Sequence, residues 1–152
     1  MVNYIKIIIY NSYYKKGLSS MKLDKKIMEE KIRDYREFKS CSESTLMALC
    51  ETAEYPMTKA EICKLACGFA GGMGGTFDEG TCGALTGALM ANGLLIDDEV
   101  KIKSNAKILF NKFKEEYDSV CCGTITNNGE DKSPCVDCCV FIANVLADLL
   151  DE

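Results

Sequence analysis

The chain has 152 residues, of which 47% are hydrophobic, and its net charge is −5. A chain of this length and composition can bury a full core as one domain, which argues against disorder. The acidic balance argues against a nucleic-acid binder, because such proteins present a basic stripe. The lack of histidine excludes histidine-based nucleophile activation, histidine metal ligands and histidine-ligated haem. A transition-metal site must therefore use thiolates, with or without carboxylates.

Ten cysteines stand out in a chain that lacks the features of a secreted disulfide scaffold. The N-terminal apolar run, residues 5–10, is broken by Lys6, is too short to span a membrane and precedes no A-x-A-like cleavage site. We therefore expect a cytoplasmic, reducing compartment and no membrane span. Cysteines in that setting are more often catalytic, metal-binding or core residues than structural disulfides.

Residues 1–20 are rich in Tyr and Ile and carry few charges, whereas Met21 opens a charged helical pattern. We interpret the segment as a tail, as a β-prone arm, or as translation from an upstream start codon that leaves Met21 as the true start. The predicted organisation is an N-terminal arm or tail at 1–20 and a helical cysteine-rich domain at 21–152.

Helical periodicity and capping signals predict the first three helices. The first follows Leu23, where Met28, Ile32, Tyr35 and Lys39 lie on one helical stripe and charged residues lie on the others. Ser40 with Glu43, and Thr58 with Glu61, fit capping boxes, in which each side chain satisfies a free N–H group at a helix start. These two pairs predict the starts of the second and third helices.

A glycine-rich segment at 68–75 interrupts the helices, because glycine is a poor helix former. A fourth helix is predicted at 81–94, and a fifth after the acidic caps at 97–98. A polar loop at 124–132 precedes the last helix, for which Ser133 is the expected N-cap and Pro134 the first helical residue. The resulting fold class is all-α, an irregular bundle of five or six helices with a glycine-rich loop, in a single domain.

Three cysteines fall at predicted helix starts, namely Cys41, Cys82 and Cys135. A helix N-terminus presents free N–H groups and a partial positive charge, which stabilise a thiolate over a thiol and lower the pKa of a cysteine. A thiolate is both a nucleophile and a metal ligand. The placement therefore favours reactive or ligating thiols over inert ones.

Two further groups of cysteines have the spacing of functional thiols. Cys121 and Cys122 are adjacent, so they rarely pair with each other but can serve a metal or exchange with a third thiol. Cys135-x-x-Cys138 has the spacing of a redox or metal pair, and Cys139 adjoins it.

Glycines near the fourth helix call for a different interpretation. Residues 75–81 have the glycine spacing of a P-loop but lack its lysine, and their acidic side chains would repel a phosphate, so we exclude a nucleotide site. Gly83 and Gly87 begin a small-residue face that allows a second helix to approach closely. That face serves packing alone, or it holds Cys82 near cysteines of other helices.

Several stretches together resemble the C_GCAxxG_C_C family of redox-active proteins. They are the six residues from Cys41, the glycine-rich stretch from Gly68, the stretch from Gly80 to Ala88, residues 113–122, and Cys135 with the helix that follows. The resemblance covers residues 25–150 or so. It implies a small, mostly helical bacterial or archaeal protein with redox activity. Related domains occur joined to multihaem cytochromes, which implies electron transfer and an iron–sulfur cluster.

By position, the cysteines of the family correspond to Cys41, Cys82, Cys122 and Cys135. The resemblance makes these four the predicted catalytic or metal-ligating residues, and we assign Cys121, Cys138, Gly80 and Gly83 to cofactor binding. The chain departs from the family pattern in its N-terminal arm and in six additional cysteines, which leave open which member of each neighbouring pair acts. Those six are Cys50, Cys63, Cys67, Cys121, Cys138 and Cys139.

The predicted function is that of a redox protein with two alternative mechanisms. In one, four thiolates hold an iron–sulfur cluster that passes single electrons. In the other, Cys41 or Cys82 attacks a disulfide or oxidant as a thiolate, and Cys122 or Cys135 resolves the product. The alternative is a non-catalytic helical domain with a structural four-cysteine zinc site or a protein-interaction role. The expected partner is another redox protein, and a homodimer that buries the small-residue face is a further expectation.

Overall fold

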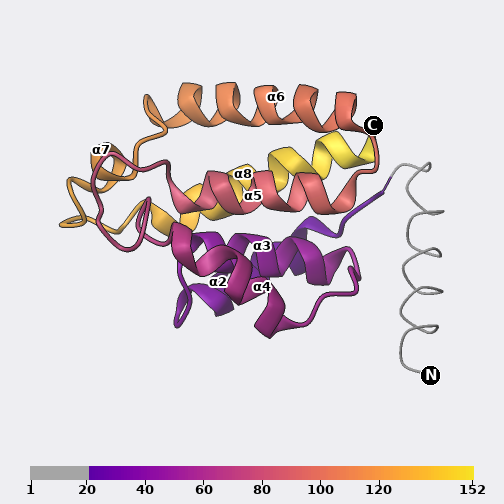
Figure 1. Cartoon of the computed structure of the whole chain (residues 1–152), viewed down its shortest axis with the longest axis horizontal. Coiled ribbons are helices and arrows are strands. Elements are labelled where there is room, and N and C mark those ends of the chain that lie inside the picture. The colour runs from indigo at the N-terminus through magenta and orange to yellow at the C-terminus, as the bar shows by residue number, and fades with distance from the viewer. Residues whose placement is uncertain (1–20) are drawn as a thin grey trace.

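The computed structural model describes residues 21–152, and the predicted arm at 1–20 lies outside them. Within this range the chain forms seven α-helices, one short 3-10 helix and no strand (Figure 1), which confirms the all-α prediction. The elements are α2 (Lys25–Arg36), α3 (Cys41–Thr52), α4 (Lys59–Ala66), η1 (Cys67–Phe69), α5 (Gly83–Leu95), α6 (Glu99–Tyr117), α7 (Cys122–Thr126) and α8 (Cys135–Asp151). None of these helices is both long and apolar enough to cross a membrane.

The predicted capping residues begin their helices as expected. Ser40 accepts from the Glu43 N–H group while the Glu43 carboxylate accepts from the Ser40 N–H group, which completes a capping box at α3. Thr58 caps α4 in the same way, and the Asp98 side chain accepts from two N–H groups at the start of α6. Local sequence therefore determines where these three helices start.

Two boundaries near the C-terminus differ from the prediction. The five-residue helix α7 begins at Cys122 and includes the first three residues of the predicted polar loop at 124–132. It ends where Asn127 adopts a left-handed backbone conformation. The last helix begins at Cys135, with Pro134 as its N-cap, because the Ser133 N–H group donates to Asp131 and holds Ser133 in a turn. Cys135 is thereby the first helical residue of α8.

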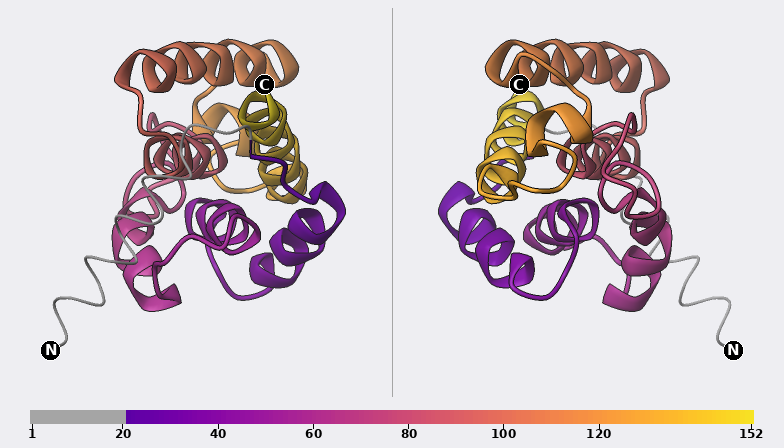
Figure 2. Two further views of the ribbon diagram at one scale, coloured as in Figure 1. Left: turned by 90° about the vertical axis from the view of Figure 1, so that its right-hand side faces the viewer. Right: turned by 90° about the vertical axis from the view of Figure 1, so that its left-hand side faces the viewer.

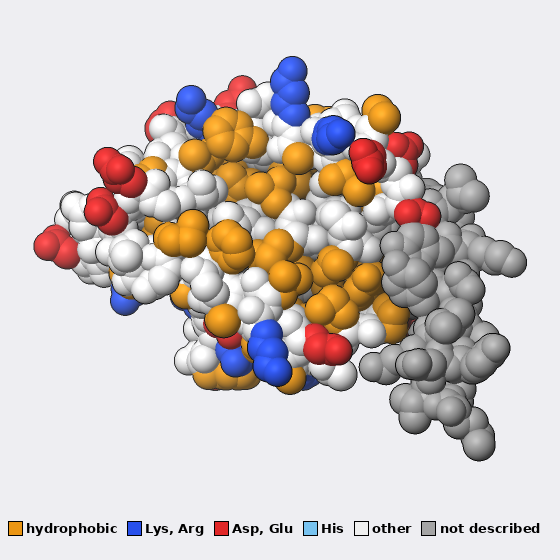
Figure 3. Space-filling view, in the orientation of Figure 1, with side chains coloured by type: hydrophobic (Ala, Val, Ile, Leu, Met, Phe, Trp, Pro, Cys, Tyr) orange, Lys and Arg blue, Asp and Glu red, His pale blue; other side chains and the backbone are white. Residues whose placement is uncertain are grey.

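Helix α3 lies at the centre of the bundle. Every residue from Ser42 to Cys50 is buried, because α2, α4, α5 and α8 all pack against this helix. Helix α6 forms a separate outer layer across α5 and α8, as the end-on views of Figure 2 show. Its Phe110 is 41% exposed, and Leu65 of α4 is 43% exposed. Figure 3 shows hydrophobic side chains gathered in a band across the middle of one face of the molecule.

The small-residue face of α5 packs inside the chain. A Cβ atom added at Gly87 would lie 2.6 Å from the Ser42 carbonyl oxygen of α3, so only glycine permits this approach of the two backbones. Ala84, Ala88 and Ala91 on the same helix are fully buried. The face is therefore occupied by α3 and is not available to a second copy of the chain, and a homodimer would have to use another surface.

Candidate thiol redox site

The four cysteines predicted as catalytic each lie at the start of a helix. Cys41, Cys122 and Cys135 are the first residues of α3, α7 and α8, and Cys82 is the N-cap residue of α5. All four thiols therefore lie beside the free N–H groups of a helix end, where a thiolate is stabilised. The sequence predicted this placement for three of them and missed it for Cys122, because α7 was not expected.

These four helix starts meet at one pocket of about 220 Å³. Its wall contains five thiols, two cations and no carboxylate. The lining residues are Arg36, Ser40, Cys41, Ala70, Gly71, Gly75, Phe77, Cys82, Gly83, Cys122, Ile125, Thr126, Lys132, Cys135 and Cys138. The structure thus brings all four predicted cysteines together and adds Cys138 to them.

Backbone hydrogen bonds position the two loops that carry Cys82 and Cys122. The Cys82 N–H group donates to the Val120 carbonyl over 2.7 Å, and the Cys122 N–H group donates to the Gly80 carbonyl over 2.8 Å. Gly80 also packs directly on Gly72, since a Cβ atom at Gly80 would lie 2.7 Å from the Gly72 carbonyl carbon. The glycine-rich loop is therefore required for close backbone contact, and Gly80 supports the pocket from behind.

The thiols of the pocket act on one another's pKa in two pairs. Cys82 is paired with Cys138, and Cys41 is paired with Cys135. Cys139 adjoins the second pair through a hydrogen bond to Cys41, and its Sγ lies 3.7 Å from the Cys41 carbonyl oxygen. Each pair joins helix α8 to a helix that is distant in sequence.

Of the Cys82 and Cys138 thiols, Cys82 is the one whose pKa is lowered. The hydrogen bond from the Cys138 thiol has the largest effect, and the N–H groups of Ala84 and Leu85 and the positive charge of Arg36 add to it, against the cost of burial. The same hydrogen bond raises the pKa of Cys138, which therefore remains the protonated partner. The pair thus places a thiol of lowered pKa beside one of raised pKa, an asymmetry that favours attack by Cys82 in thiol–disulfide exchange.

The remaining pocket thiols are less acidic. Burial and the nearby charge of Cys82 raise the pKa of Cys122 to about 11. The hydrogen bond with Cys41 and burial raise the pKa of Cys135. For Cys41, the hydrogen bond with Cys135 lowers the pKa, but the hydrogen bond with Cys139 and burial outweigh it, so the pKa is raised. Hydrogen bonds from neighbouring thiols and burial thus outweigh the helix N-termini at Cys41 and Cys135, and burial outweighs the N-terminus at Cys122.

Cys121, which was predicted to bind a cofactor, does not line the pocket. Its Sγ donates to the Asp78 carbonyl over 3.2 Å. The N–H group and the hydroxyl of Thr124 lower its pKa. Of the adjacent pair, Cys122 therefore faces the pocket and Cys121 lies outside it.

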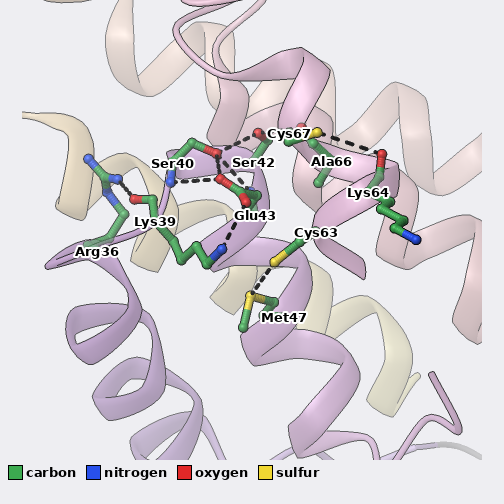
Figure 4. A network of polar contacts seen from close by, with 10 residues as sticks. All are labelled: Arg36, Lys39, Ser40, Ser42, Glu43, Met47, Cys63, Lys64, Ala66 and Cys67. Carbon is green, nitrogen blue, oxygen red and sulfur yellow. Dashed lines mark hydrogen bonds and ion pairs between the residues drawn. The ribbon is translucent and has the colours of Figure 1, made fainter. Parts of the chain in front are cut away.

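A second polar network surrounds the start of α3 and includes Cys63 (Figure 4). The Cys63 Sγ lies 3.7 Å from the Met47 Sδ, and Lys39 and Glu43 form an ion pair beside it. Cys67, one turn further along, is exposed, and its Sγ contacts the Lys64 carbonyl oxygen. Neither thiol lines the pocket.

Sequence reasoning missed the two cations of the pocket. Arg36 is the last residue of α2, and Lys132 lies in the loop before α8, with its Nζ 4.5 Å from the centre of the Phe77 ring. No local pattern marks either residue, because each reaches the pocket only through the packing of distant elements. The positive charge of Arg36 acts on Cys41, Cys82 and Cys135.

The arrangement of donors bears on which metal cofactor the pocket fits. Among residues 21–152, no group of three or more Cys, Asp or Glu side chains is positioned to hold a single metal ion. A zinc ion would therefore require the pocket thiols to rearrange. An all-thiol donor set is nevertheless the one that iron–sulfur clusters use, so the pocket fits such a cluster in its chemistry.

The fold and the pocket define an all-helical, cysteine-rich protein with a thiol-lined site. A family model described as "Putative redox-active protein (C_GCAxxG_C_C)" matches residues 39–149, which is most of the chain. The chain therefore belongs to the C_GCAxxG_C_C family. Comparison with curated proteins and comparison with solved structures gave no match.

Proposed function

We propose that the chain is a redox protein that reduces disulfide bonds through the thiols of the pocket, with Cys82 as the attacking residue and Cys138 as the resolving residue. The observation that carries the proposal is that both thiols line the same pocket, on α8 and at the start of α5. Cys138 thus takes the place that the sequence had assigned to Cys122 or Cys135. The lowered pKa of Cys82 supports its role, because the thiolate is the nucleophile.

The reaction consists of two exchanges. The Cys82 thiolate attacks one sulfur of the substrate disulfide, which forms a mixed disulfide and releases one substrate thiolate. Cys138 then gives up its proton and attacks the Cys82 sulfur, which forms the Cys82–Cys138 disulfide and releases the second substrate thiolate. The substrate gains two electrons as two thiols, and the protein loses two. A small-molecule thiol then reduces the protein disulfide to its dithiol form and is itself oxidised to a disulfide.

The second thiol pair extends this capacity. Cys41 and Cys135 line the same pocket, and Cys135 lies one turn from Cys138 on α8. The two pairs together give up four electrons when both dithiols are oxidised to disulfides. A reducing compartment such as the cytoplasm would keep both pairs in the dithiol form.

An iron–sulfur cluster is the second candidate, favoured by the number of thiols in the pocket. Cys41, Cys82, Cys122 and Cys135 come from four helices and line one space, whereas a dithiol mechanism needs only two of them. These four residues would hold the cluster, which would supply one-electron transfer when bound. Arg36 and Lys132 would offset the negative charge of the thiolates.

The test begins with protein purified without oxygen. Iron and labile sulfide are measured together with the visible absorbance spectrum, and the free thiols are counted. The reduced protein is then mixed with a small disulfide, and Cys138→Ser is expected to trap the mixed disulfide on Cys82, seen by intact mass. Cys67→Ser, at an exposed site outside the pocket, is the matched control. Stoichiometric iron and sulfide that are lost in Cys122→Ser would favour the cluster over the dithiol mechanism.

A further inference from the structure

We propose that the pocket selects small anionic disulfides as substrates, an inference that rests on the proposed disulfide reduction and adds the charge and size of the substrate to it. The pocket combines five thiols with Arg36 and Lys132, and none of the described residues that line it is acidic. This composition contrasts with the net charge of −5 of the whole chain. The positive charge is therefore a local property of the site.

Arg36 supplies a buried donor that has no protein partner. Its Nη1 donates to the Lys39 carbonyl, which fixes the guanidinium at the end of α2. Its Nε is buried and has no hydrogen-bond partner among the described residues. A buried polar group without a partner is costly, and an anion in the pocket would provide the missing acceptor.

Lys132 provides the second cation, from a loop that is distant in sequence from Arg36. Its ammonium group lies over the Phe77 ring, and both residues line the pocket. Its side chain makes no salt bridge among the described residues, so its charge is free to act on a ligand. A cleft lined by one sign of charge raises the local concentration of a ligand of the opposite sign.

Size and burial exclude a folded protein as the direct substrate. Cys82 is 4% exposed and Cys138 is fully buried, so a disulfide must enter the pocket of about 220 Å³ to reach them. A disulfide with a short carboxylate arm on each sulfur meets both conditions. Its carboxylates pair with the two cations while one sulfur meets Cys82, and it leaves as two carboxylated thiols after the two exchanges.

The experiment compares three small disulfides of similar length and different charge. Fully reduced protein is mixed with dithiodiglycolate, an anion, with bis(2-hydroxyethyl) disulfide, which is neutral, or with cystamine, a cation. The rate of thiol loss is divided by the rate at which each compound oxidises dithiothreitol, which removes differences in intrinsic reactivity. We expect the anion to react on the order of tenfold faster than the neutral compound, and the cation to react slowest.

Variants identify the source of the selectivity. Lys132→Gln and Arg36→Gln are each expected to lower the ratio of anion to neutral rates severalfold, and Lys103→Gln is the matched control, since it removes the same charge from an exposed site on α6. Equal normalised rates for all three compounds would overturn the charge selectivity and leave disulfide reduction intact. A failure of all three to oxidise the protein would overturn disulfide reduction itself. If Arg36→Gln does not fold, Lys132→Gln in its exposed loop still decides the question.

Discussion

Two buried thiols in different regions of the bundle behave in opposite ways. Cys50 lies in the central helix α3 within the hydrophobic core and is 1% exposed, and Cys82 lies at the pocket and is 4% exposed. Burial raises the pKa of Cys50 to about 12. The pKa of Cys82 is lowered despite similar burial, because the Cys138 thiol and two N–H groups donate to its sulfur. Hydrogen-bond donors, rather than exposure, therefore account for the opposite pKa shifts of these two thiols.

Removal of each thiol in turn should give the largest contrast between the two regions. Cys82→Ser is expected to lower the rate of disulfide reduction by on the order of a hundredfold or more, because a hydroxyl does not supply a thiolate nucleophile. Cys50→Ala leaves that rate unchanged and lowers only the free energy of unfolding. Both are measured by single-turnover thiol loss and by denaturant unfolding. Equal losses of rate in the two variants would show that a thiol in the pocket contributes no more to disulfide reduction than a thiol in the core.

The pH at which each thiol ionises should also differ between two thiols within the pocket. Cys82 should alkylate with a pH midpoint below that of an ordinary cysteine, and Cys122 with a midpoint at about 11. Labelling with a small neutral reagent at a series of pH values, followed by mass mapping of each site, gives both midpoints. The midpoint is independent of accessibility, which affects only the plateau rate. A common midpoint for the two thiols would contradict the assigned role of Cys82.

Helix α5 connects the two regions, and its glycines test how closely it must pack. Gly87→Ala is expected to lower the free energy of unfolding by about 1–3 kcal/mol, since its Cβ atom would meet the Ser42 carbonyl oxygen at 2.6 Å. Gly93→Ala, on the exposed side of the same helix, meets nothing within 4 Å and should raise stability by about 0.5–1 kcal/mol. Urea unfolding of both variants measures the difference, and the same sign for both would refute the close approach.

Alkaline pH should destabilise the core gradually, through the Cys50 thiol alone. The pKa of Cys50 is raised in the folded state, so its contribution is fully present below the pKa of the unfolded chain and is lost as the pH rises toward about 12. The free energy of unfolding should therefore fall by at most about 1.4 kcal/mol per pH unit above about pH 9 on account of this thiol. Cys50→Ala should flatten the pH dependence. An unchanged slope in that variant would assign the loss to other groups.

Local sequence signals accounted for the helices and for part of the site. The capping boxes at Ser40 and Thr58 predicted helix starts because they depend on residues only three positions apart. The position of Cys41 and Cys135 at helix starts followed from the same kind of signal. The pairing of Cys82 with Cys138 did not, because it depends on how α5 packs against α8.

The pocket cations illustrate the same limit. Arg36 and Lys132 look like ordinary surface residues in the sequence, and only the packing of α2 and of the loop before α8 brings them to the thiols. The sequence revealed the small-residue face of α5 but not the element that packs on it. Close packing against α3 and close packing against a second copy of the chain require the same small residues. The composition of the pocket and the packing partner of α5 therefore depend on tertiary contacts, which local sequence patterns do not reveal.

The pocket thiols come from four helices, α3, α5, α7 and α8, so their reactivity reports on whether these helices unfold together. None of these four helices can open without exposing at least one of the thiols, because each contributes its first turn to the shared wall. Cys50 lies outside the pocket and is 1% exposed, so its protection from alkylation measures the free energy of opening of the core. The exposed Cys67 reacts without any opening and provides the reference rate in the same molecule. The chain thus carries natural probes that distinguish local from global unfolding without any added label.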